Sequence, residues 1–184
     1  MLNKMNNIEY IKIEGLLFPK NYYFSFKDPN GGLWANKIST TENIYRMGIS
    51  ALVAMKIDKI KDFKMLNIDN DLSKMQKDEI FYFIKGQHYD INLFAPFKAE
   101  IIETNPLLDQ HPILTQESVY DEHWLLEVKL DEELNYEKEN WIRPENNRFE
   151  KFIKLIIRGD VALKERCCPD LLDSGVVRRI EKQK

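Results

Sequence analysis

The sequence is poor in cysteine, in excess basic charge and in long apolar runs. Its 184 residues include two cysteines, too few for a disulfide framework, which fits a reducing compartment. With 27 lysines and arginines against 30 acidic residues, the chain lacks the basic footprint of a nucleic-acid-binding protein. It has no apolar run of roughly 18 residues, as a membrane-spanning helix needs, and its first residues lack an apolar signal core. We therefore expect a cytoplasmic protein that binds neither nucleic acid nor membrane.

Motifs that carry catalysis are also missing. The sequence has no nucleophile elbow, no phosphate loop of the G-x-x-x-x-G-K type and no H-E-x-x-H pair. Its three histidines, His88, His111 and His123, show no spacing that would join them with the cysteines in a metal site. The sequence therefore predicts a protein that is not an enzyme and holds no metal.

Short apolar periods dominate the first 130 residues. Alternating apolar positions between Trp124 and Leu130 are typical of a half-buried strand, and the turn residues at 28–32 separate two further extended segments. Apolar residues then recur at spacings of three and four between Ile49 and Ile60. This predicts one short amphipathic helix that begins after Ser50, among many short strands.

The character of the chain changes after residue 130. Residues 131–147 are polar and acidic, as in a linker or an adherent arm. Phe149, Phe152, Ile153 and Ile156 then recur at helical spacing and Gly159 follows, which predicts a helix that docks on its own core or on a second protein. A second short helix is predicted from Pro169 onward. We accordingly divide the chain into a domain at 1–130 and a helical extension at 131–184.

A longer pattern runs through the middle of the chain. The segment from Lys85 to Pro96 aligns without a gap to E-S-V-K-A-A-S-D-L-Y-A-P, and S-G-E-V-V-E-V-N follows in register. Upstream, a G-I-T helix opening and its L-G-D-I end also align. The matched positions include Phe18, Pro19, Leu33, Trp34, Gly48, Ile49, Ser50, Ile57, Ile60, Leu93, Phe94, Ala95, Pro96, Glu100, Ile101, Ile102, Glu103, Asn105, Leu108, Pro112, Leu114, Tyr120, Glu122 and Trp124.

Through these motifs the chain resembles the H protein of the glycine cleavage system, a lipoyl-carrier family, over about residues 18–130. The resemblance implies a mainly β fold: a flattened β-barrel and sandwich hybrid of the lipoyl-domain type with a short internal helix. The family's glycines at three turns are replaced here by Asp78, Ala99 and His123. Since glycine marks positive φ or close backbone approach, each replacement predicts an altered turn.

The resemblance also places the family's lipoyl lysine at His88. Lipoylation acylates a primary amine on a long flexible stem, and an imidazole has no such amine. The resemblance therefore implies an H-protein-like domain without lipoate, with no cofactor, that binds or scaffolds a protein partner. His88 itself is interpreted first as a solvated turn residue, and second as a ligand, proton donor or recognition residue.

An alternative keeps the carrier function, with lipoate on Lys85 or with thiol chemistry at Cys167 and Cys168. Lys85 lies three residues from the lysine position, which changes its strand face and its reach. Adjacent Cα atoms lie about 3.8 Å apart, shorter than the roughly 4.4–6.8 Å of ordinary disulfides. A disulfide between the two cysteines would therefore be strained and labile, whereas the plainer interpretation is two small apolar residues at a helix end. A third possibility is an unrelated binding protein on the same scaffold.

Overall fold

Most of the strands belong to one large antiparallel sheet. The computed structural model describes residues 8–25, 32–66, 73–137 and 140–159. The large sheet has the order β12-β3-β4-β5-β11-β10-β7. Its strands are β3 (Tyr23–Ser25), β4 (Leu33–Lys37), β5 (Ile44–Ile49), β7 (Lys74–Met75), β10 (Ala99–Thr104), β11 (Leu126–Lys129) and β12 (Trp141–Ile142).

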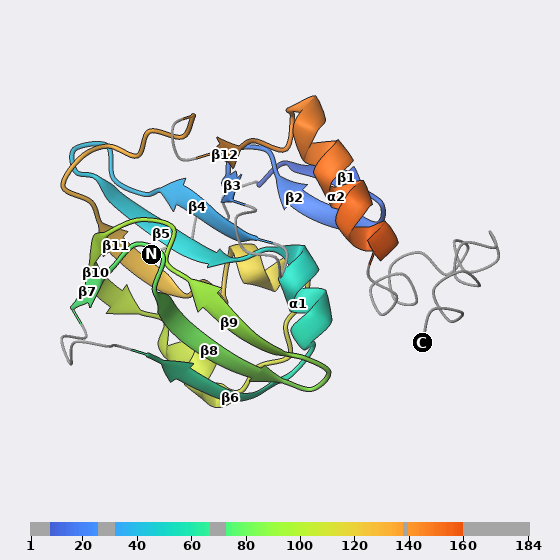
Figure 1. Ribbon diagram of the computed structural model, residues 1–184, viewed down its shortest axis with the longest axis horizontal. Helices are drawn as coiled ribbons and strands as arrows, with labels where there is room; N and C mark the ends of the chain where they lie inside the picture. Colours follow the sequence, from blue (N-terminus) through green and yellow to red (C-terminus); the bar gives the residue numbers. More distant parts are fainter. Residues whose placement is uncertain (1–7, 26–31, 67–72, 138–139, 160–184) are drawn as a thin grey trace, which may run out of the picture.

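Two smaller sheets complete the β structure (Figure 1). One has the order β6-β8-β9, and the other pairs β1 with β2. Their strands are β1 (Tyr10–Ile13), β2 (Leu16–Pro19), β6 (Ile60–Met65), β8 (Ile80–Gly86) and β9 (Asp90–Phe94). Over the described residues the three sheets stay open and none closes into a barrel. The predicted mainly β fold class is confirmed.

Alternation along the strands decides which face each sheet buries. In β9, Ile91 and Leu93 are buried, whereas Asp90, Asn92 and Phe94 are exposed. Because successive side chains of a strand point to opposite faces, such a strand has one face on the core and one in water.

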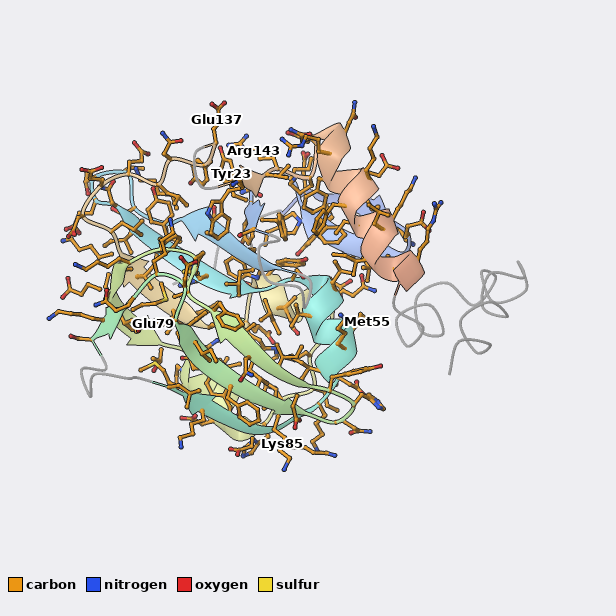
Figure 2. The ribbon with its side chains drawn as sticks, in the orientation of Figure 1. Tyr23, Met55, Glu79, Lys85, Glu137 and Arg143 are labelled. Carbon is orange, nitrogen blue, oxygen red and sulfur yellow. The ribbon has the colours of Figure 1, made fainter. Side chains whose placement is uncertain are left out.

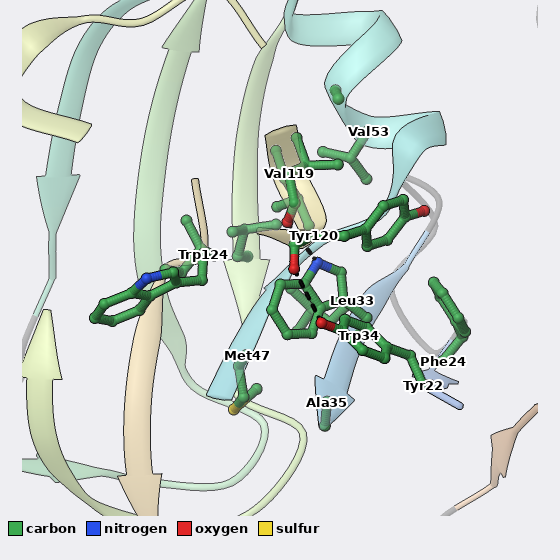
Figure 3. Close-up of a cluster of buried hydrophobic side chains, with 14 of the residues drawn as sticks. Tyr22, Phe24, Leu33, Trp34, Ala35, Met47, Val53, Val119, Tyr120 and Trp124 are labelled. Carbon is green, nitrogen blue, oxygen red and sulfur yellow. Dashed lines mark hydrogen bonds between the residues drawn. The ribbon is translucent and has the colours of Figure 1, made fainter. Parts of the chain in front are cut away.

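A cluster of aromatic side chains forms the centre of the core (Figure 3). The Trp34 indole donates a hydrogen bond to the Val119 carbonyl at 3.0 Å, and the Tyr22 hydroxyl donates to the Tyr120 carbonyl at 3.0 Å. Tyr120 in turn accepts a bond from the Ala51 amide at 3.0 Å. These residues pair their polar atoms inside the apolar cluster, which avoids the cost of burying an unsatisfied group. They also tie the turn before β11 to the start of the internal helix.

The internal helix α1 (Ala51–Ile57) confirms the predicted element, with Ser50 at the N-cap position. It ends earlier than the prediction, because Asp58 adopts a φ of 62° and Ile60 opens strand β6 instead. Between the helix and this strand, the backbone of Lys59 forms an isolated antiparallel β-bridge with Ile113. None of the described helices is long and apolar enough to cross a membrane.

The segment after residue 130 packs on the preceding strands. Strand β12 pairs with β3, and the ring of Tyr136 stacks on Tyr23, over which the Arg143 guanidinium lies at 4.6 Å. Figure 2 shows Tyr23 and Arg143 close together above the sheet. The described residues of the acidic segment, 131–137 and 140–142, thus belong to an adherent arm, while the domain division at 130 stays a prediction.

The helix α2 (Asn147–Gly159) lies across the β1–β2 hairpin (Figure 1). Phe149 is fully buried, with its ring 5.0 Å from Phe18 and 5.1 Å from Phe24. Ile153 and Ile157 are buried beside it, whereas Phe152 and Ile156 of the predicted stripe are half-buried. The helix therefore docks on its own chain, rotated toward Ile157. The helix predicted from Pro169 lies outside the described residues, as do Cys167 and Cys168. Two 3-10 helices, η1 (Pro106–Gln110) and η2 (Ser118–Tyr120), complete the elements.

Candidate functional site

The candidate site is the turn of the β8–β9 hairpin. The two strands pair antiparallel, with Ile84 opposite Ile91 and Lys85 opposite Asp90. The Gly86 amide donates to the Tyr89 carbonyl at 3.0 Å and closes the turn. Three residues, 87–89, thus form the tip, which protrudes beside the end of α1 in Figure 1.

The tip rests directly on the C-terminal end of α1. The Gln87 amide donates to the Ile57 carbonyl at 2.9 Å. Gly86 makes this approach possible, since a Cβ there would lie 2.4 Å from the Tyr89 oxygen and 2.9 Å from the Ile57 Cα and carbonyl oxygen. The glycine serves close backbone approach, and the hairpin tip has a fixed position against the helix.

His88 is exposed at this tip, as the sequence predicts for a turn residue, and its side chain keeps 44% of its surface accessible. Its Nε2 lies 3.3 Å from Oδ2 of Asp58, the residue that ends α1. In the L-G-D-I register of Ile57 and Ile60, Asp58 occupies the glycine position. Asp58 was not predicted as a partner of His88, although an aspartate in a glycine position was a usable signal.

The chemistry available at the tip is limited. An imidazole beside one carboxylate can exchange a proton or hold a hydrogen bond. Among the described residues, no three side chains of His, Cys, Asp or Glu gather as a metal site. His111 is exposed at the end of η1 with a φ of 50°. The chemical groups found at the tip are thus one imidazole and one carboxylate.

The other predicted acceptor, Lys85, lies within strand β8 and not at the tip. Its Cα pairs with Asp90 on one side and with Asp62 on the other, so that two acidic residues flank it. Its side chain is exposed, near the lower edge of the view in Figure 2. The structure thus brings His88 and Asp58 together and leaves Lys85 outside the turn.

The replaced family glycines differ in their backbone. Asp78 keeps a positive φ of 65°, so the aspartate accepts the strained conformation that glycine would adopt freely. Ala99 lies in a regular strand. His123 is half-buried, and its burial lowers the pKa of the imidazole below the ordinary value. Of the three replacements, only Asp78 has a positive φ.

The comparison with known families identifies the group to which the chain belongs. The family model described as "Glycine cleavage H-protein" matches residues 26–154. The chain belongs to this family. H proteins are carriers rather than catalysts, they typically bear lipoate, and they interact with the other glycine cleavage proteins.

Individual relatives belong to the same family, but each alignment covers only part of this chain and part of the relative. A glycine cleavage system H protein of Bacteroides fragilis is 28% identical over 39% of this chain and 57% of its own length. That of Corynebacterium jeikeium is 26% identical over 54% of this chain and 76% of its own. The matched region spans less than two thirds of the first relatives.

A solved H protein from Mycobacterium marinum shares the fold. It superposes with a TM-score of 0.56 at 13% identity and covers 74% of this chain and 99% of its own. At this identity the likeness shows the fold alone.

Proposed function

We propose that this protein is an H-protein-like domain without a lipoyl group, which binds or scaffolds a protein partner in the cytoplasm and catalyses no reaction. The observation that carries the proposal is the exposed position of His88 at the tip of the β8–β9 hairpin. The family register assigns the lipoyl lysine to the same residue. A carrier needs its acceptor at an accessible tip, and here that tip presents an imidazole.

The contacts of the tip support the interpretation that the hairpin has lost its lipoyl lysine and kept its fold. The close approach at Gly86 and the bond from Gln87 to Ile57 hold the hairpin in place without any modification. Lipoate requires an amide with a primary amine, which His88 lacks. A hairpin tip that packs on α1 and presents an imidazole in place of an amine fits a surface for recognition.

The alternative is a genuine carrier that uses Lys85 or the Cys167–Cys168 pair. Exposure of Lys85 favours it, because an acceptor must be accessible. Its position in mid-strand between Asp62 and Asp90 opposes it. The family register places the lipoyl lysine at the hairpin tip instead, at the position of His88.

The deciding experiment is the intact mass of the full chain purified from its host, followed by incubation with a lipoate ligase. We expect no lipoyl mass on the wild-type protein and no support of methylamine transfer in glycine cleavage. The doubly substituted His88→Lys, Lys85→Glu protein restores the family's lysine and its acidic neighbour, and should accept lipoate. The matched control, His88→Arg with Lys85→Glu, has a cation without an acylable amine and should not. Lipoate on any lysine of the wild-type protein would overturn the proposal.

A further inference from the structure

A cleft of about 360 Å³ opens on the molecule away from the hairpin. No residue that lines it belongs to β8, β9 or α1, so it is separate from the candidate site described above. Its lining comes from the segments before β1 and β3, from β4 and the residue after it, from β5, and from the last residue of η2 and the residue that follows. The lining residues that matter here are Asn21, Tyr22, Asn36, Ile38, Arg46 and Asp121.

Two opposite charges share this cleft. Glu127 and Trp124 contact the Arg46 guanidinium. Its Nε donates to Oε1 of Glu127 at 3.0 Å, and its Nη2 donates to the same oxygen. The central carbon of the guanidinium lies 4.8 Å from the centre of the Trp124 ring. A guanidinium has five N–H donors, so these contacts orient the group without using all of them. Asp121 is exposed on the same lining.

Tyr22 lines the same cleft. Its hydroxyl donates to the Tyr120 carbonyl at 3.0 Å and also has a side-chain hydrogen bond with Asn36. Burial raises the pKa of Tyr22 to about 12; Arg46 acts to lower it and Asp121 to raise it. Both charges therefore act on one point of the cleft. Ile38, 42% exposed, adds an apolar edge.

We propose that the cleft binds a small zwitterionic α-amino acid, with its carboxylate on Arg46 and its ammonium on Asp121. A ligand with both charges contacts both side chains, whereas an amine contacts Asp121 alone and a carboxylate contacts Arg46 alone. Asn21 and Asn36 supply amide groups beside the two charges, and Ile38 suits an uncharged side chain. Ligand pockets have volumes of about 300–1,000 Å³, so a cleft near the lower end suits a small molecule.

The test is a calorimetric and NMR titration of the full chain with alanine and with leucine. Alanine is also compared with compounds that keep only one of its two charges. Ethylamine and propionate serve for alanine. Charge-assisted hydrogen bonds contribute about 1.5–3 kcal/mol, so we expect each single-charge compound to bind at least about tenfold more weakly. Asp121→Asn preserves the shape and should lower the affinity for both amino acids by about tenfold.

The matched control is Glu122→Gln, which removes the neighbouring carboxylate outside the cleft and should leave the affinity unchanged. Equal binding of ethylamine, propionate and alanine would overturn the proposal. So would equal losses in the two variants, or the absence of saturable binding by either amino acid. None of these results bears on the lipoylation test, since that test concerns the hairpin alone.

Discussion

Gly86 is the residue at which the hairpin depends most directly on the absence of a side chain. In Gly86→Ala the new Cβ would meet backbone atoms of Tyr89 and Ile57 at 2.4 and 2.9 Å, and backbone cannot move aside as a flexible side chain does. Overpacking of this kind costs about 1–3 kcal/mol. We expect the free energy of unfolding, measured in urea, to fall by that amount.

Gly159→Ala provides the matched control for this prediction. A Cβ at Gly159 has nothing within 4 Å, so its effect should stay within about 0.5 kcal/mol. Equal effects of the two substitutions would show that the tip does not pack on α1 as described.

His123 gives the protein a pH dependence on the acid side. Burial lowers the pKa of this imidazole, and its Nδ1 is buried without a hydrogen-bond partner among the described residues. The unfolded chain therefore binds the proton more tightly than the folded chain does. The resulting stabilisation is present above the ordinary pKa of about 6.5 and is lost as the pH falls below it.

We accordingly expect the free energy of unfolding to decrease between about pH 7 and pH 5, and this slope to be flatter in His123→Asn. Denaturant unfolding of both proteins at several pH values measures the two slopes. Identical slopes would exclude a contribution from His123.

At the scale of elements, α2 acts as a part of the core. Its inward face buries Phe149, Ile153 and Ile157, while Leu155 on the outward face is 69% exposed. Phe149→Ala removes a ring packed against Phe18 and Phe24, and such truncations cost about 3–5 kcal/mol. We expect a corresponding drop in the melting temperature.

Leu155→Ala is the control on the same helix and should change stability by less than about 0.5 kcal/mol. If both substitutions left the melting temperature unchanged, α2 would not be docked on its own chain in solution. Loss of a partner without loss of stability would then support docking in trans.

At the scale of the whole molecule, buried tyrosines set the alkaline limit of stability. Burial raises the pKa of Tyr22, Tyr82 and Tyr120 above the ordinary value of 10.0. The unfolded chain therefore releases these protons at lower pH than the folded chain. The stabilisation is complete below about pH 10 and is lost as the pH rises toward the raised values.

We expect unfolding above about pH 10 in which phenolate absorbance of the buried tyrosines and loss of circular dichroism appear together. Gradual ionisation of all the tyrosines in a protein that keeps its fold would contradict the described burial.

The parts of the fold that could be predicted from the sequence are those that depend on the local spacing of apolar residues and on turn residues. The alternation in 124–130, the three-and-four spacing after Ser50 and the turn at His88 each reflect neighbouring residues. The end of α1 was predicted three residues late, because Ile60 fits the helical period and the competing bridge from Lys59 to Ile113 joins distant segments. The helix at 147–159 was predicted, but its rotation toward Ile157 depends on the surface that it meets.

The sequence by itself determined the short strands and the internal helix, because each follows from residue type and local spacing. The family, and the imidazole in place of its lipoyl lysine, followed from the resemblance of the ordered motifs to those of H proteins. Only the tertiary structure decided that Asp58 faces His88, that α2 docks on the β1–β2 hairpin and that Arg46 and Asp121 share a cleft. These contacts join residues that are far apart in the chain. They depend on the packing of the whole core, about which the local periodicity of apolar residues carries no information.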